Sequence, residues 1–529
     1  MAMLTSPAVG TGSPRYNAAV DLIERNLRVR PQKTAFVDDH GSYTYADLAE
    51  RVDRCGAALL ELGLEAEHRI VLGLLDTIDF PTAFLGAIEA GIVPIPVNTL
   101  FQPADYAFIL ADSRAKAAIV SAELLAAFEA AAQQANWSGT IVVSDPGEIA
   151  RETRYPRLDT LLARAKPLDA AAPSGPDDVA FWLYSSGSTG KPKGTVHVQT
   201  SLIRTAELFA QQILGFQESD VVFSAAKLFF AYGLGNALTF PMSVGATSVL
   251  LAARATPDAV NRMLRTHRAT IFCGVPTLFG SLLVHPELPS REELALRLCT
   301  SAGEVLPEEI GRSWTERFGV EIIDGIGSTE MLHIFVSNRP GAVRYGTTGR
   351  PVPGYRARLV DEHGAEVAPG EIGELEVSGP TAAAYYWNNR EKTRRTFAGE
   401  WTRTGDKFRV DEEGNFVHCG RADDMLKVGG IWVSPTEVES ALIAHELVLE
   451  AAVIGVADEH ELVKPKAFVV LKPGVRGDDE LAHALKLHVK SRLAPYKYPR
   501  WIAFVDELPK TATGKIQRHV LRARESERP

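Results

Sequence analysis

The chain has few cysteines, and they are scattered. Its 529 residues contain only 4 of them, Cys55, Cys273, Cys299 and Cys419, and no pair has the CxxC spacing of a zinc or redox site. Disulfide frameworks belong mainly to small secreted domains that are dense in cysteine. We therefore expect neither disulfides nor a zinc site, and we expect the protein to work in a reducing compartment, the cytoplasm.

Long apolar runs are also missing. The most apolar region, 70–97, is interrupted by Asp76, Asp79 and Glu89, so it predicts a βαβ unit and not a membrane-spanning helix. The N-terminal stretch MAMLTSPAVGTGSP lacks the basic start and the apolar core of a signal peptide. The sequence therefore predicts no association with a membrane.

An overall excess of basic residues is absent. Lys and Arg number 56 against 66 Asp and Glu, a net charge of −10, which argues against a general nucleic-acid binder. The charge is uneven, because 11 basic residues stand against 4 acidic ones between Lys486 and Arg528. That stretch is either a solvated face or a basic surface that meets a polyanionic small molecule. At 529 residues the chain is too long for one hydrophobic core, so we expect at least two domains.

The order of the expected elements predicts an α/β fold. Up to about residue 300, apolar periodicity alternates between helices and strands, as in largely parallel sheets covered by helices. The expected elements are a helix over 43–62, a strand over 69–75, a helix over 80–90, and strands over 92–97, 220–225, 246–251 and 270–275. After residue 340, short strands separated by Gly- and acid-rich turns follow at 355–360, 373–378 and 414–419.

A compact block ends the chain. Its expected elements are helices over 435–445 and 478–493 and strands over 451–456, 465–471 and 500–505. About one hundred residues suffice for a small domain. We therefore predict a large N-terminal domain of several subdomains, residues 1–422, with largely parallel sheets and a small β-rich subdomain. A small, mobile α+β C-terminal domain follows over residues 423–529, with the boundary near 420–424.

The most informative segment is YSSGSTGKPKG, residues 184–194. It follows an apolar stretch, 179–184, that predicts a buried strand, and it combines three glycines, four small hydroxyl residues (Ser or Thr) and two lysines. Such a loop binds phosphate through backbone N–H groups, hydroxyls and the ammonium groups of Lys191 and Lys193. It is not a Walker A loop, because Pro192 stands where that loop needs Ser or Thr. A surface linker is the alternative, but linkers rarely follow directly on a buried strand.

Two turns of small residues have related compositions. DGIGSTE, 324–330, places glycines and hydroxyls before Glu330, and a carboxylate near phosphates suits a Mg²⁺ ion. A turn that ends in a surface glutamate is the alternative. SAGEVL, 301–306, leaves room for a planar base against the backbone, although many loops share this composition.

Three further segments carry single informative residues. TGD, 404–406, offers a carboxylate that can accept both hydroxyls of a ribose, although a plain turn is the default interpretation. In GRADDMLKVGG, 420–430, the paired glycines let a ligand's chain pass close to the backbone, or the segment is an ordinary linker. In LPKTATGKIQR, 508–518, Lys515 is either a solvated charge or a tethered cation for a reacting phosphate.

Together and in this order, these segments resemble the acyl-adenylate-forming enzymes: acyl- and aryl-CoA ligases, beetle luciferases and the adenylation domains of peptide synthetases. The resemblance runs from about Leu22 to Arg524, and the combination is specific although most of its parts are not. FFAYGLGN at 229–236 and GSTEMLHIF at 327–335 look like the benzoate-CoA ligases. The resemblance implies an enzyme of aromatic-compound degradation, monomer or homodimer, that uses ATP, CoA and Mg²⁺.

The resemblance also implies roles for individual residues. Glu330 matches a Mg²⁺ ligand, Thr329 an α-phosphate contact and Lys515 the lysine needed for adenylation. Asp423 matches the hinge between the domains. The remaining positions are Ser186, Gly187, Ser188, Thr189, Gly190 and Lys191 at the triphosphate, Gly303, Glu304, Val305, Asp324, Gly325 and Ile326 at the adenine, Asp406 and Arg421 at the ribose, and Gly429 and Gly430 at the pantetheine arm of CoA. The position of Ile326 is often aromatic in the family, which leaves the stacking of the adenine open.

The nature of the acid follows from the stretch LFFAYGLGN, 228–236. It carries no charged residue, so the ammonium of an amino acid would be buried there without a partner. Aromatic side chains pack well on an aromatic ring, so we expect an aryl carboxylate such as benzoate. Core packing is the alternative for Phe229. The resemblance adds the pocket positions Phe230, Ala231, Tyr232, Ala302, Gly327, His333 and Ile334.

Two rival functions stay open at this point. One is an adenylate-forming enzyme for another small carboxylate, or one that passes the adenylate to a carrier protein or to oxygen. The chain shows no carrier domain of its own, and Gly429 and Gly430 favour free CoA as the acceptor. The other rival is a non-catalytic nucleotide-binding protein. The presence of both Glu330 and Lys515 argues against it, because binding alone would not require both.

Overall fold

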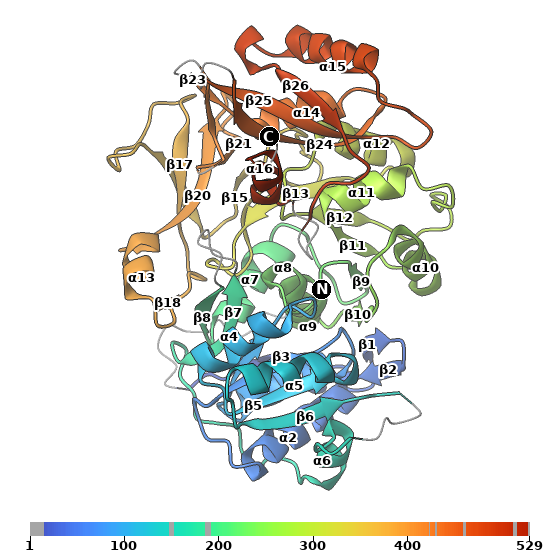
Figure 1. The fold of residues 1–529 in the computed structure, drawn as a ribbon. Coiled ribbons are helices and arrows are strands. Elements are labelled where there is room, and N and C mark those ends of the chain that lie inside the picture. Colours follow the sequence, from blue (N-terminus) through green and yellow to red (C-terminus); the bar gives the residue numbers. More distant parts are fainter. Residues whose placement is uncertain are drawn as a thin grey trace. The chain divides into compact units, whose positions relative to one another are not determined.

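The computed structural model describes residues 15–147, 153–185, 192–422, 424–428, 431–458, 462–510 and 516–526. The chain forms two compact units, which Figure 1 shows in the colours of the sequence. The first unit is built from Met1–Ala255, Ser328–His333 and Gly379–Phe397, and the second from Thr256–Gly327, Ile334–Ser378 and Ala398–Pro529. Two short segments from later in the chain therefore return to the first unit, and they carry much of the site.

A parallel sheet with the strand order β4-β3-β5-β6 lies in the first unit. Its strands are β3 (Arg69–Gly73), β4 (Val93–Pro96), β5 (Ala117–Ser121) and β6 (Thr140–Ser144). β4 and β5 are buried along their whole length, as expected for parallel strands covered on both faces. The βαβ unit predicted for the apolar region is confirmed: β3 and β4 pair in parallel, and α3 (Asp79–Glu89) connects them.

The helices of the first unit begin and pack for identifiable reasons. α2 (Tyr45–Glu61) starts at a capping box, in which Thr44 and Asp47 exchange side chain–backbone hydrogen bonds. α3 is fully buried, so its Asp79 needs partners, and Arg51 and Ser144 donate to its carboxylate. The other helices of this unit are α1 (Ala18–Leu27), α4 (Pro103–Ser113), α5 (Leu125–Gln134), α6 (Leu158–Arg164), α7 (Ser201–Thr205), α8 (Ala231–Leu234), α9 (Phe240–Val244) and α13 (Arg390–Thr396), with the short turns η1 (Ala122–Leu124), η2 (Ala206–Gln211) and η3 (Gly235–Thr239).

Two more groups of strands complete the first unit. β10 (Thr247–Val249) pairs in parallel with β1 (Thr34–Asp38) and β9 (Val221–Ser224), and β2 (Gly41–Thr44) is antiparallel to β1. The second group is a three-stranded antiparallel sheet of β7 (Val179–Ser185), β8 (Lys193–Val198) and β18 (Tyr385–Tyr386). The buried strand expected over 179–184 is therefore confirmed as β7.

The second unit begins with a sheet of mixed direction. β11 (Ile271–Gly274), β12 (Leu298–Ser301) and β13 (Ile322–Gly327) run parallel, and β14 (Ile334–Ser337) and β15 (Arg350–Pro351) continue the sheet antiparallel. The helices are α10 (Pro257–His267), α11 (Pro276–Leu283) and α12 (Glu308–Phe318). The segments SAGEVL and DGIGSTE thus start in neighbouring parallel strands, with Ser301 beside Asp324.

The predicted β-rich region is confirmed as an antiparallel sheet in the second unit. It contains β16 (Arg356–Val360), β17 (Gly373–Ser378), β20 (Trp401–Val410) and β21 (Phe416–Arg421), and the short β19 (Phe397–Ala398) neighbours β20. The interpretation of TGD as a plain turn was wrong, because Thr404 and Asp406 lie within β20. The pairing of β17 with β20 shifts register next to this site, so the local chain is irregular although it belongs to a strand.

The C-terminal block has the expected α+β elements. Antiparallel β24 (Val448–Ala457) and β25 (Val463–Leu471) are joined in parallel by β26 (Trp501–Phe504). Val438, Leu442, Val453, Val469 and Leu485 belong to the core of this block. The remaining elements are β22 (Leu426–Val428), β23 (Ile431–Val433), α14 (Pro435–Ile443), α15 (Asp479–Arg492), η4 (Pro495–Lys497) and α16 (Arg518–Ser526). The boundary near 420–424 stays a prediction.

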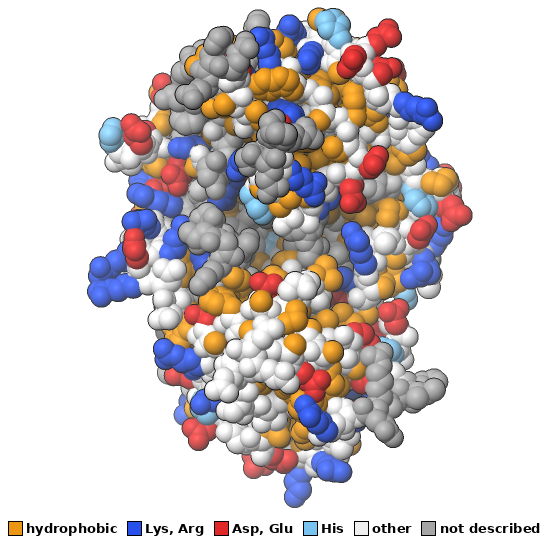
Figure 2. Space-filling view, viewed as in Figure 1, with side chains coloured by type: hydrophobic (Ala, Val, Ile, Leu, Met, Phe, Trp, Pro, Cys, Tyr) orange, Lys and Arg blue, Asp and Glu red, His pale blue; other side chains and the backbone are white. Residues whose placement is uncertain are grey.

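Acidic and basic side chains alternate over the face that Figure 2 shows. In the basic stretch near the C-terminus, Lys497 pairs with Glu437 at 2.6 Å and Lys510 with Glu450 at 2.6 Å. These two charges are therefore partly neutralised within their own unit. No helix in the described part of the chain is long and apolar enough to span a membrane. All four cysteines are buried and unpaired.

Candidate active site

The six residues Ser328–His333 form the centre of the site in the first unit. Neighbouring strands and loops hold three successive carbonyl oxygens of this segment. Nε2 of His197 lies 2.9 Å from the oxygen of Thr329, the N–H of Ala383 donates to the oxygen of Glu330 at 2.7 Å, and the hydroxyl of Thr381 donates to the oxygen of Met331 at 2.7 Å. The backbone around Glu330 therefore has one defined course.

The Glu330 carboxylate has two strong donors on one oxygen. The Tyr386 hydroxyl donates to Oε1 at 2.6 Å, and Nζ of Lys193 donates to the same atom at 3.3 Å. Burial by itself raises the pKa of Glu330, but Lys193 and Tyr386 more than offset this effect and leave the pKa below its ordinary value. Glu330 is therefore ionised at neutral pH, as a carboxylate that binds a cation must be.

His197 supports the same segment from β8. Its ring is fully buried and stacks on Phe181 with centroids 5.1 Å apart. Burial lowers the pKa of His197 to about 4, so the imidazole is neutral at pH 7. Because a carbonyl oxygen only accepts, Nε2 carries the proton and donates to Thr329. Nδ1 is then an acceptor, and it has no hydrogen-bond partner among the described residues.

Aromatic rings surround the predicted pocket residue His333. Its ring lies 4.5 Å from Phe240 and 5.5 Å from both Tyr232 and Phe209, centroid to centroid. Burial lowers the pKa of His333 to about 3, and its Nε2 donates to the carbonyl of Tyr232 at 3.3 Å. Gly235 passes directly under this ring, where a Cβ would lie 2.4 Å from Cδ2 of His333. This part of the predicted pocket is therefore uncharged and aromatic.

The stretch 228–236 is only partly exposed. Phe230, Ala231 and Tyr232 keep some exposed surface, whereas Phe229 is only 6% exposed and packs against Phe230 with centroids 4.3 Å apart. Core packing thus holds for Phe229, as the sequence allowed. Asp76, after β3, accepts the N–H of Leu228, and burial raises the pKa of Asp76 to about 6.

The predicted adenine segments lie in the second unit. Asp324 is buried, and burial raises its pKa well above the ordinary value. Gly325 is needed for packing, since a Cβ there would lie 2.7 Å from Cγ2 of Ile334 and 3.0 Å from the carbonyl oxygen of Val336. The remaining predicted residues of this unit at the adenine and the acid follow β12 or end β13. After β12, Ala302 is buried, and Gly303, Glu304 and Val305 are at least partly exposed. At the end of β13, Ile326 and Gly327 are also at least partly exposed.

The predicted ribose residues face each other on neighbouring strands. Asp406 of β20 and Arg421 of β21 are paired in register, and Nη1 of Arg421 lies 3.4 Å from both carboxylate oxygens. His418 contributes a third polar group, with Nε2 3.6 Å from Oδ1 of Asp406. The carboxylate is 13% exposed and the guanidinium side chain 48% exposed, so the pair is open to a ligand from the arginine's side.

One backbone contact links two predicted segments within the second unit. The Glu304 carboxylate accepts the N–H of Ile516 at 3.0 Å, so the chain directly after Lys515 is bound to the SAGEVL turn. Several predicted residues themselves lie outside the described residues. These are Ser186, Gly187, Ser188, Thr189, Gly190, Lys191, Asp423, Gly429, Gly430 and Lys515.

Sequence reasoning missed several residues of the site. Lys193 was expected to bind phosphate with its loop, and here it pairs with Glu330. Tyr386, His197, Thr381 and His418 were not singled out. The only signal for Tyr386 was an aromatic run, AYYW, and for His197 a histidine in an apolar strand. Both patterns are typical of core packing, so the sequence offered no reason to select them.

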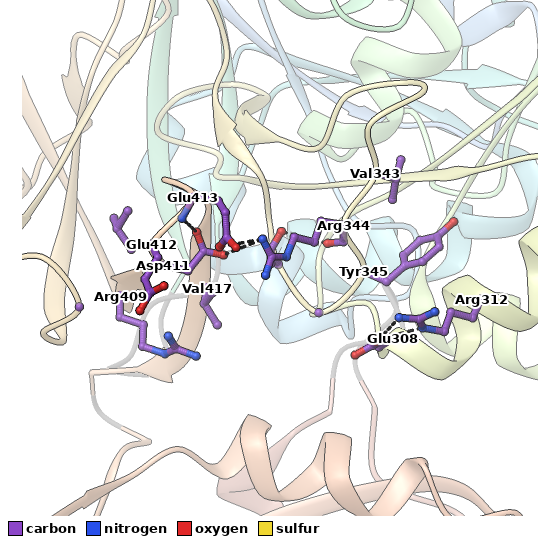
Figure 3. Close-up of a pocket in the computed structure, with 14 residues that line it drawn as sticks. Glu308, Arg312, Val343, Arg344, Tyr345, Arg409, Asp411, Glu412, Glu413 and Val417 are labelled. Atoms are coloured by element: carbon purple, nitrogen blue, oxygen red, sulfur yellow. Dashed lines mark hydrogen bonds and ion pairs between the residues drawn. The ribbon is translucent and has the colours of Figure 1, made fainter.

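A cavity of about 820 Å³ in the second unit contains none of the predicted site residues in its lining. Figure 3 shows its charged lining, where Arg344 pairs with Glu413 at 2.7 Å and Arg312 with Glu308 at 2.5 Å. These two arginines are therefore already neutralised by acids of the same cavity. The cavity is a feature separate from the site.

Comparison with known proteins gives consistent matches over the chain. A family model described as "AMP-binding enzyme" matches residues 23–387, and one described as "AMP-binding enzyme C-terminal domain" matches residues 437–515. The benzoate–CoA ligase of Thauera aromatica is 60% identical over 98% of both chains. The 4-hydroxybenzoate–CoA/benzoate–CoA ligase of Rhodopseudomonas palustris is 51% identical over 96% of this chain and 94% of that one.

Solved structures agree with these matches. A benzoate CoA ligase from Burkholderia xenovorans superimposes with a TM-score of 0.91 at 55% identity, over 96% of this chain and 100% of that one. An anthranilate CoA ligase in complex with anthranoyl-AMP superimposes with a TM-score of 0.92 at 43% identity, over 97% and 98%. Both solved structures therefore share the fold of this chain over nearly its whole length. The chain therefore belongs to the AMP-binding enzyme family.

Proposed function

We propose that the chain is an acid–thiol ligase that activates benzoate with ATP and transfers the benzoyl group to CoA. The main observation in favour of benzoate as the acid is the neutral aromatic cluster around His333. It offers no charged partner for an amino or a second carboxylate group and good packing for a phenyl ring. The Thauera benzoate–CoA ligase, at 60% identity, supports the same assignment.

The first step forms benzoyl-AMP. The benzoate oxygen attacks the α-phosphorus of ATP, the bond to the β-phosphate oxygen breaks, and pyrophosphate leaves. Negative charge builds up on the oxygens of the departing pyrophosphate, and the ammonium group of Lys515 stabilises that charge. Thr329, whose carbonyl His197 holds, contacts the α-phosphate through its hydroxyl. The loop residues Ser186–Lys191 bind the β- and γ-phosphates, and Asp406 with Arg421 binds the ribose.

A magnesium ion fits the donor set of the site. No cluster of three His, Cys, Asp or Glu side chains occurs among the described residues, so these residues alone offer no complete set of metal ligands. Mg²⁺ characteristically needs one or two carboxylates plus phosphate oxygens, and the ionised Glu330 supplies a carboxylate. With ATP bound, Glu330 would hold Mg²⁺, and the ion would neutralise phosphate charge.

The second step forms the thioester. The CoA thiolate attacks the acyl carbon of benzoyl-AMP, and AMP leaves with the electrons of the C–O bond. The pantetheine arm passes Gly429 and Gly430. Lys515 and this passage belong to the same C-terminal domain, 423–529, so we propose that the domain turns about Asp423 between the two steps. The four buried thiols suit a reducing compartment, and we place the enzyme in the cytoplasm.

The choice of acid is tested by pyrophosphate release and thioester formation across a panel of acids. The panel contains benzoate, the 3- and 4-hydroxybenzoates, anthranilate, cyclohexane carboxylate and short fatty acids. We expect the highest kcat/KM for benzoate, with free CoA as acceptor. A higher kcat/KM for any other member contradicts benzoate as the substrate. Adenylate formation without thioester would show that the acceptor is not free CoA.

The two-step mechanism is tested with Lys515→Ala and Asp423→Pro. Lys515→Ala is expected to stop adenylate formation but still convert supplied benzoyl-AMP and CoA to thioester. Asp423→Pro fixes the backbone at the proposed hinge, so it is expected to spare adenylation and slow thioester formation. Equal loss of both steps in both variants, with unchanged melting temperatures, contradicts the rotation.

A further inference from the structure

Lys193 and Tyr386 form a compact arrangement around Glu330. Both donate to the same oxygen, Oε1, which leaves Oε2 to other partners. They also contact each other, with Nζ of Lys193 3.2 Å from the Tyr386 hydroxyl and 4.4 Å from the centroid of its ring. The hydroxyl therefore bridges a cation and an anion, and it fixes the orientation of the carboxylate.

The position of Tyr386 is itself well determined. Tyr386 lies in β18 and pairs with Thr195 of β8, the strand that begins with Lys193. Thr393 accepts the N–H of Tyr386 at 3.0 Å and donates its hydroxyl to the carbonyl of Tyr386 at 3.3 Å. The Tyr386 ring packs near Phe397, with centroids 5.3 Å apart, and the residue is 3% exposed. The adjacent Tyr385 is 36% exposed.

We propose that Tyr386 is a positioning residue for adenylation, which holds the Glu330 carboxylate through its hydroxyl in the orientation required by Mg²⁺ and ATP. The inference rests on the proposed role of Glu330. A group that ligates a metal is held by further hydrogen bonds, and loss of such a bond typically costs 10- to 100-fold in affinity or rate. Tyr386 enters the site from the segment Gly379–Phe397, which the motifs around ATP do not include.

The two half-reactions separate this role from a general effect on folding. Adenylation uses the triphosphate and therefore Glu330, whereas the attack of CoA on benzoyl-AMP involves neither pyrophosphate nor its cation. A residue that acts through Glu330 must affect the first half-reaction and spare the second. A residue that only stabilises the fold affects both to a similar degree.

The test substitutes Tyr386→Phe, which removes the hydroxyl and keeps the ring. Acid-dependent ATP–pyrophosphate exchange is expected to fall about 10- to 100-fold, and the Mg²⁺ concentration for half-maximal exchange to rise. Conversion of supplied benzoyl-AMP and CoA is expected to stay within about twofold of the unmodified enzyme. Tyr385→Phe is the matched control and is expected to change neither rate. Titration calorimetry of ATP with and without Mg²⁺ gives a readout besides activity: the gain in affinity from Mg²⁺ is expected to shrink in Tyr386→Phe only.

A double-mutant cycle with Glu330→Gln tests whether Tyr386 acts through Glu330. We expect the double variant to be no slower in exchange than Glu330→Gln alone, because the hydroxyl then has no carboxylate to hold. Additive losses, or an unchanged Mg²⁺ dependence in Tyr386→Phe, overturn the proposal.

If Tyr386→Phe does not fold, Thr393→Val is used instead, because it loosens the Tyr386 backbone. A smaller loss, confined to exchange, is then expected. Equal loss in both half-reactions overturns the proposal.

Failure of the proposed role of Tyr386 can be distinguished from failure of the proposed function. If the unmodified enzyme prefers another acid, benzoate is the wrong substrate, and the exchange assay is run with the preferred acid. If the unmodified enzyme shows no exchange with any carboxylate, the proposed function fails. The calorimetric titration then still decides whether Tyr386 affects the binding of Mg²⁺ and ATP.

Discussion

Glu330 and Asp324 are two acids of one motif, DGIGSTE, yet their pKa values shift in opposite directions. Burial raises the pKa of Asp324 well above its ordinary value, and its Oδ1 has no hydrogen-bond partner among the described residues. The pKa of Glu330 lies below its ordinary value, because Lys193 and Tyr386 outweigh the same effect of burial. The difference lies in the partner: a buried carboxyl group stays ionised only when a cation or strong donors reach it.

The comparison assigns different tasks to the two acids. Under the proposed function, the raised pKa of Asp324 reduces repulsion toward the phosphates of ATP, whereas the lowered pKa of Glu330 favours an anion that can bind Mg²⁺. Lys193 makes this difference, although its position in a phosphate-binding loop predicts another partner. The following substitutions change the charge of each acid or of its partner.

The largest effect is expected for Glu330→Gln, which removes the negative charge and keeps the shape. Adenylation is expected to fall at least about 100-fold, a typical cost for removing one group that stabilises charge in the transition state. ATP–pyrophosphate exchange measures it. Conversion of supplied benzoyl-AMP serves as the internal control and should be nearly unchanged. Exchange at the original rate would mean that Glu330 does not bind the cation.

Lys193→Met removes the cation. The pKa of Glu330 is then expected to rise through burial, as the pKa of Asp324 does. The free energy of unfolding at pH 7 is expected to fall by about 2–3 kcal/mol, because the carboxylate stays buried without its cation. In the original protein the pKa of Glu330 is lowered, so its contribution is present above the unfolded pKa and is lost as the pH falls through the folded pKa. The deficit of the variant should therefore be smaller at about pH 3.5, below the ordinary pKa of glutamate, than at pH 7. Urea unfolding at both pH values measures this, and an equal deficit at both contradicts the explanation.

Asp324→Asn replaces an acid whose neutral form burial already favours. We expect a change of less than about 1 kcal/mol at pH 5, since the amide has the same shape and no charge to bury. The raised pKa of Asp324 provides stability that is present below its unfolded pKa and is lost as the pH rises toward the folded pKa. Between pH 5 and pH 8 the melting temperature of the variant should therefore decline less than that of the original protein. A parallel decline would show that Asp324 is ionised.

An effect of similar size is expected for Glu89→Gln, at a buried acid outside the site. Burial and Asp53 raise the pKa of Glu89 to about 8. Its stabilising contribution is therefore complete below about pH 4.5 and is lost as the pH rises through 8. Above pH 8 the variant is expected to be more stable than the original protein by about 1 kcal/mol. Melting curves at pH 6 and pH 9 measure the difference, which should disappear or reverse at pH 6.

Much of the fold could be predicted because local patterns determine it. The apolar stretch 179–184 became β7, and the interrupted apolar region 70–97 became β3, α3 and β4. The antiparallel region after residue 340 and the α+β block at the C-terminus also appeared as expected. The turn expected at TGD did not, because pairing of β20 with β17 and β21 includes those residues in a strand.

The sequence by itself determined the order of the elements, the small-residue loops, the uncharged stretch 228–236 and the candidate acids, since each depends on residues close together in the chain. Only the tertiary structure decided in which direction the pKa of each acid shifts. Tyr386 reaches Glu330 across 56 positions, Lys193 across 137, and His197 reaches Thr329 across 132. The charge of a buried carboxyl group depends on such distant partners, because its pKa is set by the atoms within a few ångströms and not by its neighbours in sequence.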